Sequence, residues 1–133
     1  MVGIVVVSHS ERAAEGIAEI AAEMAGDTRI EPVGGDGKGG IGTVPDAIED
    51  AIDAAAGGSG DAADADGVVV LVDLGSAVMN ADVAVELSDA EAVIADAPVL
   101  EGAVNAAVAA TDPSATIESV REQAEAARDV EKL

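Results

Sequence analysis

Two uninterrupted runs of apolar, mostly β-branched residues constrain the fold of this chain more than any other feature. Residues 4–7 read Ile-Val-Val-Val and residues 68–72 read Val-Val-Val-Leu-Val. A strand with one wet face alternates polar and apolar residues, whereas a continuously apolar strand is covered on both faces. Both runs therefore predict central strands of a parallel sheet that lies between two layers of helices.

The segments around these runs alternate between helix and strand patterns. The predicted elements are a helix over residues 11–25, a strand over 29–33, helices over 45–56 and 77–87, a short strand over 92–94, and helices over 98–110 and 117–130. Alternation of this kind indicates a three-layer α/β domain with a parallel sheet. The length of 133 residues predicts one domain, residues 1–133.

Carboxylates recur at helical spacing on the first two predicted helices. Their positions are Glu11, Glu15, Glu19 and Glu23 on the first, and Asp46, Glu49, Asp50 and Asp53 on the second. The apolar faces predicted opposite them are Ala13, Ile17, Ile20 and Met24, and Ala47, Ile48, Ala51, Ile52 and Ala55. Like charges four residues apart destabilise a helix by about 0.2–0.5 kcal/mol per pair, and molar salt screens them. We therefore hypothesise a halophilic protein, adapted to a salt-rich cytoplasm.

Composition excludes several classes of function. With 27 Asp and Glu against 6 Lys and Arg, the net charge of -21 argues against nucleic acid and membrane surfaces as partners. The absence of Phe, Tyr and Trp leaves no ring to stack on a flavin or nucleobase. The absence of Cys excludes disulfides and thiolate metal sites, and no signal peptide or membrane span is evident. We expect a cytoplasmic protein with no cofactor and no metal.

The single histidine is the main candidate for chemistry. His9 follows the first buried run, between two serines. Ligands of open parallel sheets bind beyond the carboxyl ends of the strands, so His9 and Asp73 would share a crevice if the two buried strands are neighbours. A carboxylate that accepts the Nδ1 proton orients an imidazole and stabilises the cation formed when Nε2 attacks phosphorus. The alternative is an incidental loop histidine. A metal site is disfavoured because the carboxylates lack ligand spacing.

The glycine-rich segment, residues 34–42, is a weaker indication of a functional site than His9. Residues 34–42 contain six glycines and formally match G-x-G-x-x-G, but they follow the second predicted strand rather than the first. This position disfavours a nicotinamide site, and Gly39 after Lys38 excludes a Walker A loop. A flexible solvent loop is the alternative to a functional role.

Four further residues are candidates for binding phosphate. Gly42 and Thr43 precede a helix, with Thr43 as its predicted N-cap, and could present backbone N–H groups to an anion. Ser76 starts the helix after Asp73, as a helix-start hydroxyl or as a donor to an anion. Arg12 lies one turn beyond His9 and could face the crevice, although a surface role is the alternative.

Four motifs resemble those of a known family. They are V-S-H-S-E-R-A-A-E-G at 7–16, I-G-T at 41–43, V-L-V-D-L-G-S-A at 70–77 and A-P-V-L-E-G-A-V at 97–104. Together they resemble the mannose-type enzyme IIA domain of the phosphotransferase system. The third and fourth motifs favour the branch that donates phosphoryl groups to dihydroxyacetone kinase.

The resemblance implies a three-layer sandwich with a four-stranded, mainly parallel sheet of order 2-1-3-4, and a homodimer. It implies that His9 accepts a phosphoryl group at Nε2 from the phosphocarrier HPr, which would be a separate protein. The group then passes to ADP in the ADP-binding subunit of the kinase and drives phosphorylation of dihydroxyacetone. Asp73 would orient or neighbour His9, with Gly42, Thr43, Ser76 and Arg12 around the phosphate.

Two other functions stay open at this point. The same carrier could serve a mannose-type sugar permease, or the domain could be a non-catalytic regulatory module that binds phosphate as a signal. A receiver domain fits poorly, because Ser-His-Ser stands where that class has an acidic pair.

Overall fold

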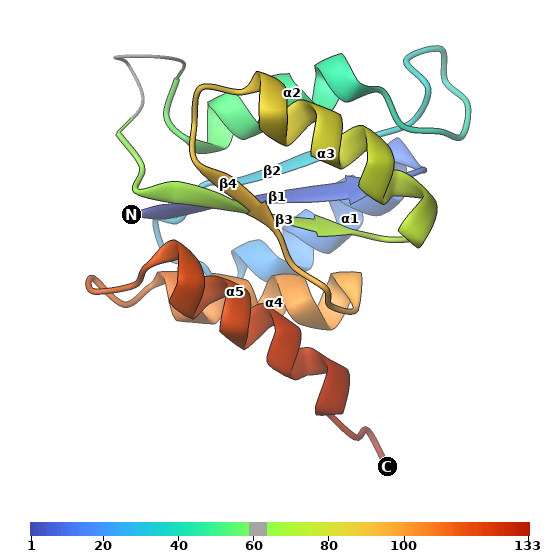
Figure 1. Ribbon diagram of the computed structural model, residues 1–133. Helices are drawn as coiled ribbons and strands as arrows, with labels where there is room; N and C mark the ends of the chain where they lie inside the picture. Colours follow the sequence, from blue (N-terminus) through green and yellow to red (C-terminus); the bar gives the residue numbers. More distant parts are fainter. Residues whose placement is uncertain (59–63) are drawn as a thin grey trace.

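The computed structural model describes residues 1–58 and 64–133 and contains a parallel sheet of order β2-β1-β3-β4 (Figure 1). Its strands are β1 (Val2–Ser8), β2 (Ile30–Gly34), β3 (Gly67–Val72) and β4 (Ala92–Ile94). The central strand β1 pairs with β2 and β3, and β3 pairs with β4, in every case parallel. The predicted α/β fold and its order 2-1-3-4 are confirmed.

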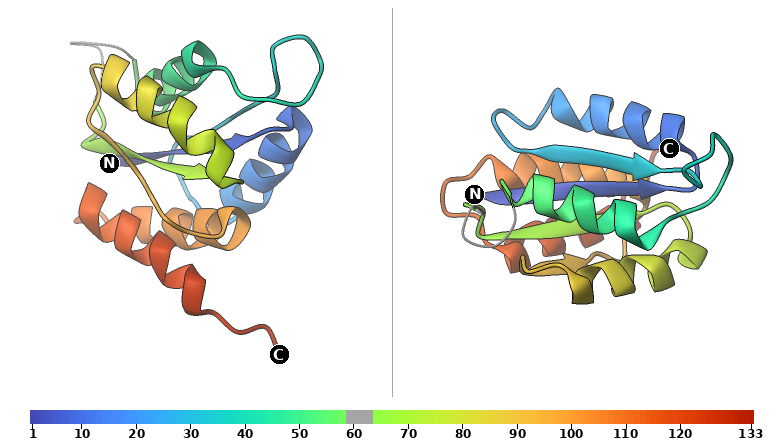
Figure 2. Two further views of the ribbon diagram at one scale, coloured as in Figure 1. Left: turned by 45° about the vertical axis from the view of Figure 1, so that its right-hand side comes forward. Right: turned by 90° about the horizontal axis from the view of Figure 1, so that it is seen from above.

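Helices cover both faces of the sheet. One layer consists of α2 (Pro45–Ala55) and α3 (Val78–Leu87), and the other of α1 (Glu11–Ala22), α4 (Val99–Ala110) and α5 (Ile117–Ala126) (Figures 1 and 2). The strand β1 is buried throughout and sends alternate side chains into the two layers. The two apolar runs are therefore central strands, as their composition predicts. Within the described ranges, no helix has the length and apolar character to cross a bilayer.

Several predicted boundaries need correction. A short 3-10 turn, η2 (Gly75–Ala77), precedes α3, and a second, η3 (Ala127–Asp129), follows α5. The N-cap of α2 is Val44 rather than Thr43, because Thr43 is engaged elsewhere. Val130, predicted on the closing helix, lies beyond it and is 56% exposed. The predicted connection over 57–66 falls partly on residues 59–63, which lie outside the described residues.

The buried face of α1 differs from the one predicted. Ile20 and Met24, expected in the core, are 51% and 55% exposed. The residues of α1 that face the core are Ala14, Ala18 and Ala21, and Ala25 is buried beyond the end of the helix, which stops at Ala22 and not at residue 25 as predicted. These alanines have the same helical spacing as the predicted set, shifted by one residue. The Val and Ile side chains of β1 fill the space between helix and sheet, so methyl-sized side chains face the sheet. Ile17, from the predicted set, is partly buried and packs against the same core.

The acidic stripe on α2 is a solvated outer surface, as the sequence indicates. Partial desolvation raises the pKa of Glu49, and the nearby charges of Asp53, Asp46, Asp50 and Asp89 raise it further. A carboxyl whose pKa rises on folding opposes folding when it is ionised, and the opposition fades as pH falls through the folded pKa. The charges that surround Glu49 therefore oppose its ionisation in the folded chain.

We predict that the midpoint of thermal unfolding rises with KCl, because salt screens this repulsion. Glu49→Gln raises the midpoint in dilute buffer at pH 7, and its advantage shrinks at pH 5 and in molar KCl. Thermal melts followed by circular dichroism measure both effects. Highest stability of the wild-type chain in dilute buffer would contradict the salt adaptation.

Candidate active site

The register of β1 and β3 brings the two main candidates together. Val7 pairs with Val72, and the backbone N–H of Asp73 donates to the carbonyl of Val7 at 3.0 Å. Both strands are parallel and end at the same edge, so the residues that follow them are neighbours. His9 and Asp73 therefore share one edge of the sheet, as predicted for adjacent strands.

Asp73 holds His9 through both its backbone and its ring. Its Oδ1 lies 2.9 Å from His9 Nδ1, and its Oδ2 accepts from the His9 backbone N–H at 3.0 Å. The two side chains are 21% and 19% exposed. Burial raises the pKa of Asp73, but hydrogen bonds from the His9 backbone, the His9 ring and Ser8 outweigh it and hold the pKa below its usual range. An ionised carboxylate only accepts, so Nδ1 carries the proton, and in the neutral ring Nε2 then has a free lone pair.

The free nitrogen of His9 faces Ser76, which is exposed on η2. The Ser76 Oγ lies 3.0 Å from Nε2, and in the neutral ring its hydroxyl is the donor to the unprotonated nitrogen. Ser76 is thus placed where a group bonded to Nε2 would lie. This arrangement presents a nucleophilic nitrogen at the surface, beside a hydroxyl that can turn to an incoming oxygen.

Ser8 is a part of this site that the sequence analysis missed. It is 2% exposed, and it is the one polar residue with a buried side chain in the described chain. Its hydroxyl donates to Asp73 Oδ2 at 3.0 Å and accepts from the Ser10 backbone N–H at 3.1 Å. Ser10 in turn caps α1 by accepting from the backbone N–H of Ala13. The sequence signal that could have identified Ser8 is a hydroxyl residue at the end of an otherwise apolar strand.

The segment before α2 is tied to the same histidine. The backbone N–H of Gly42 donates to the His9 carbonyl at 2.9 Å, so this N–H secures the backbone of the site instead of facing an open anion position. Asn80, also missed by the sequence analysis, donates to Thr43 Oγ1 at 2.8 Å. That bond leaves the proton of the Thr43 hydroxyl available for another acceptor.

The glycine-rich loop lies beyond the carboxyl ends of the strands (Figure 2). Asp36 organises it, because its Oδ1 accepts from the backbone N–H groups of Lys38 and Gly40 at 2.8 and 2.9 Å. These bonds hold the pKa of Asp36 below its usual range. At the start of the loop, a side chain on Gly34 would collide with the carbonyls of Ser8 and Ser10. The start of the loop is therefore closely packed against the histidine segment, whereas residues 37–41 are exposed.

Arg12 lies near the site without contacting it. It is exposed on the first turn of α1 and, with Glu11 and Ile41, lines a hollow of about 320 Å³ beside the glycine-rich loop. No hydrogen bond or ion pair joins it to His9 or Asp73 among the described residues. The structure therefore brings together His9, Asp73 and Ser76, places Gly42 and Thr43 next to them, and leaves Arg12 at the margin.

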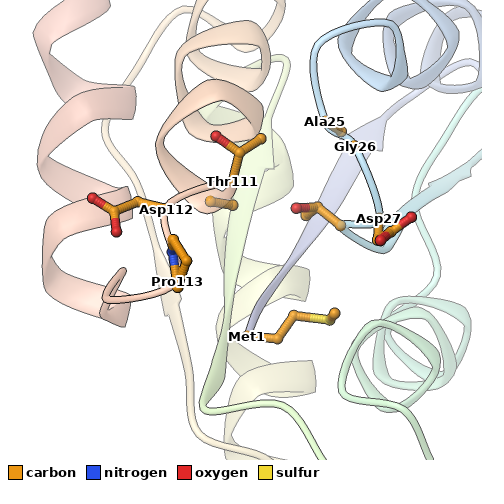
Figure 3. Close-up of a pocket in the computed structure, with 9 residues that line it drawn as sticks. Met1, Ala25, Gly26, Asp27, Thr111, Asp112 and Pro113 are labelled. Carbon is orange, nitrogen blue, oxygen red and sulfur yellow. The ribbon is translucent and has the colours of Figure 1, made fainter.

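A second hollow, of about 380 Å³, lies at the opposite edge of the sheet (Figure 3). It is lined by Met1, Ala25, Gly26, Asp27, Thr28, Ala110, Thr111, Asp112 and Pro113. Met1 precedes β1 and His9 follows it, so the length of that strand, about 20 Å, separates the two places. The described part of the chain also gathers no three His, Asp or Glu side chains in a metal-binding arrangement.

Comparisons with known proteins agree on one family. A family model described as "PTS system fructose IIA component" (EIIA-man) matches residues 3–121. The phosphotransferase subunit DhaM of a PTS-dependent dihydroxyacetone kinase from Lactococcus lactis is 37% identical over 123 residues, which cover 92% of this chain and 93% of the relative. A phosphoryl donor subunit DhaM from Listeria innocua is 40% identical over 101 residues, 76% of this chain and 75% of the relative. The crystal structure of protein EF1359, described as of unknown function, superposes with a TM-score of 0.76 at 29% identity and covers 93% of this chain and 92% of its own.

We predict that Ser8→Ala lowers the free energy of unfolding by about 1–2 kcal/mol, because it leaves buried hydrogen-bonding groups without their partner. It also raises the folded pKa of Asp73. Because the folded pKa of Asp73 lies below its ordinary value, the ionised carboxylate stabilises the fold above the ordinary pKa, and this stabilisation is lost as pH falls through the folded pKa. A higher folded pKa in the variant therefore moves the midpoint of acid unfolding to higher pH. Urea unfolding across a pH series measures both. Ser114→Ala, which removes an exposed Ser–Asp hydrogen bond, is the control and changes little. Equal behaviour of the two variants would contradict the role of Ser8.

Proposed function

The chain belongs to the EIIA-man family, in the branch of DhaM subunits, and from this premise we propose that it carries a phosphoryl group on His9 from HPr to ADP in a dihydroxyacetone kinase. The observation that carries the proposal is the orientation of the His9 ring. Nδ1 is bound to a carboxylate with a lowered pKa, and Nε2 faces an exposed hydroxyl.

In the first step, Nε2 of neutral His9 attacks the phosphorus of a phosphohistidine on HPr. The new bond is P–Nε2, the bond that breaks is the P–N bond of the donor, and the leaving group is the donor imidazole. The proton on Nδ1 stays there, between the ring and Asp73. Asp73 stabilises the positive charge that the His9 ring acquires as its lone pair enters the new bond.

In the second step, a terminal oxygen of ADP attacks the same phosphorus. The P–Nε2 bond breaks, its electron pair returns to the ring, and the products are ATP and neutral His9. The ATP then phosphorylates dihydroxyacetone in the kinase. Because the proton on Nδ1 never leaves, His9 is ready for the next donor without a proton transfer.

Ser76 and Thr43 are the proposed donors to the phosphoryl oxygens. The Ser76 hydroxyl already points at Nε2 and can turn to an oxygen bonded there. Thr43 keeps its hydroxyl proton because Asn80 supplies the bond that Thr43 accepts. Gly42 would shape the pocket through its bond to the His9 carbonyl, and Arg12 would reach the group only by moving toward it. No resident cofactor takes part in these steps.

The proposal includes the setting of the protein. Residues 1–133 would form one domain, and two copies would form a homodimer in the cytoplasm. Its partners would be HPr and the ADP-binding subunit of the kinase. The abundance of surface carboxylates supports a salt-rich, halophilic setting for these exchanges.

We predict that enzyme I, HPr and labelled phosphoenolpyruvate place an acid-labile, base-stable label on the wild-type chain. His9→Ala abolishes the label because the accepting nitrogen is gone. Asp73→Asn lowers the labelling rate by about a hundredfold or more, since a neutral amide neither fixes the Nδ1 proton nor stabilises the cation. Rapid-quench labelling gives the rates, with Asp112→Asn as a surface control that stays at the wild-type rate. Persistent labelling of His9→Ala would remove His9 from the mechanism.

We predict that the labelled chain loses its phosphate to the ADP-loaded kinase subunit and forms labelled ATP. Incubation with a mannose-type permease IIB domain in place of the kinase subunit leaves the label on His9. Chromatography of the nucleotide and protein fractions distinguishes the two acceptors. Transfer to the IIB domain alone would favour the sugar permease, and transfer to neither would favour a regulatory module.

A further inference from the structure

Three side chains beyond the ends of β1 and β3 have the arrangement of a nucleophile, a base and a carboxylate that orients the base. The Ser76 Oγ lies 3.0 Å from His9 Nε2, and Nδ1 of the same ring lies 2.9 Å from Asp73 Oδ1. This constellation activates a serine hydroxyl for covalent catalysis, and it is recognised by geometry rather than by residue order. The contacts that prepare the His9 nitrogen for attack therefore also prepare the Ser76 oxygen.

The carboxylate of this group is fixed and ionised. Its Oδ2 accepts from the Ser8 hydroxyl and from the His9 backbone N–H, each at 3.0 Å, which leaves Oδ1 for the ring. Burial raises the pKa of Asp73, but these hydrogen bonds outweigh it and hold the pKa below its usual range. The negative charge of Asp73 therefore stabilises the imidazolium that forms when His9 takes the proton of Ser76.

The backbone at Ser76 can hold the negative oxygen that develops when a hydroxyl attacks a carbonyl. Leu74 precedes η2 without a side-chain cap, and the first bonded N–H of the turn is that of Ala77, which donates to the Leu74 carbonyl. Among the described residues, no acceptor is bonded to the backbone N–H groups of Gly75 and Ser76. A side chain on Gly75 would meet no atom within 4 Å, so a substrate can approach these two donors.

The hollow beside η2 selects the kind of substrate. It has a volume of about 430 Å³, and its apolar lining includes Leu74 and Val78. The charged residues of its lining are all acidic: Asp73, Asp82 and Asp96. An anionic substrate would be repelled there, whereas a short uncharged group finds apolar contacts.

We propose that Ser76 is the nucleophile of a second activity, the hydrolysis of short, uncharged carboxylic esters. The Ser76 oxygen bonds to the ester carbon as His9 Nε2 takes the hydroxyl proton. The bond from that carbon to the alcohol oxygen then breaks, and the leaving oxygen receives the proton from Nε2. Water attacks the acyl group on Ser76 in the same way, which releases the carboxylic acid and restores the hydroxyl. Water is the only co-reactant.

This activity goes beyond the proposed phosphoryl transfer and does not rest on it, because it needs no phosphoryl donor. Both uses of the site require the lone pair on His9 Nε2. Ester hydrolysis uses it as a base, and phosphoryl transfer uses it as a nucleophile. A phosphoryl group on Nε2 therefore prevents ester hydrolysis for as long as it stays there.

The test measures hydrolysis of 4-nitrophenyl acetate by the full chain, followed by the release of 4-nitrophenolate. Ser76→Ala and His9→Gln each lower kcat/KM about a hundredfold, because one removes the nucleophile and the other its base. The matched control is Ser114→Ala, which removes an exposed serine bonded to a carboxylate but to no histidine, and which keeps the wild-type rate. Ser76 is exposed, so its substitution leaves the core intact, and circular dichroism checks that each variant is folded.

A fluorophosphonate identifies the attacking oxygen directly. The reaction joins Ser76 Oγ to phosphorus, expels fluoride and adds one phosphonyl group to the peptide that contains Ser76. Mass spectrometry of the digested chain finds this group on the wild type and on Ser114→Ala. It finds none on Ser76→Ala, and at most a trace on His9→Gln.

Two outcomes would overturn the inference. One is undiminished hydrolysis by Ser76→Ala, which would make the His9 imidazole the nucleophile. The other is a wild-type rate no higher than that of the same concentration of N-acetylhistidine, with no phosphonyl group on Ser76. Labelling of His9 by phospho-HPr is measured on the same preparation. Its failure would count against the proposed function alone, whereas intact labelling without ester hydrolysis would count against the second activity alone.

Discussion

The site depends on the parallel register between β1 and β3. Val7 lies opposite Val72, and the Asp73 N–H donates to the Val7 carbonyl. A shift of one residue would move His9 away from Asp73 and would turn every side chain of β1 to the other layer. The two apolar cores that pack against β1 therefore also fix the distance between the imidazole of His9 and the carboxylate of Asp73. The same register therefore supports the fold and the candidate site, because the strand that contributes to both cores ends just before His9.

Close approach between layers is the second feature that shapes the molecule. A side chain on Gly3 would collide with Ala55, so α2 lies directly against β1. The inner faces of α1 and α4 are likewise mostly alanine, and the bulk of the core comes from the Val, Ile and Leu side chains of the strands. With no aromatic ring available, this chain fills its interior by bringing backbones close together. Close helices also bring η2 and the segment before α2 to the same edge as His9.

The sequence predicts the sheet well because its signal is local. Continuous apolar runs identify β1 and β3, and their carboxyl ends indicate His9 and Asp73 as partners. Amphipathic spacing alone places Ile20 and Met24 inside, whereas alanines occupy the core, because spacing does not report how close a helix lies to the sheet. Ser8 and Asn80 were missed for a related reason. Their roles come from partners more than thirty residues away in the chain, and no local pattern marks such a pair.

The arrangement also bears on how the proposed phosphoryl group could be received by a chain of net charge -21. The Asp73 carboxylate is engaged by the His9 ring, the His9 backbone and Ser8, so its charge stabilises the ring from the side opposite Nε2. Arg29, Arg128 and Lys132 are paired with carboxylates, whereas Arg12 and Lys38 make no ion pair among the described residues and lie in segments next to the site. A phosphoryl group on Nε2, itself about -2, would thus meet hydroxyls and nearby cations before carboxylates.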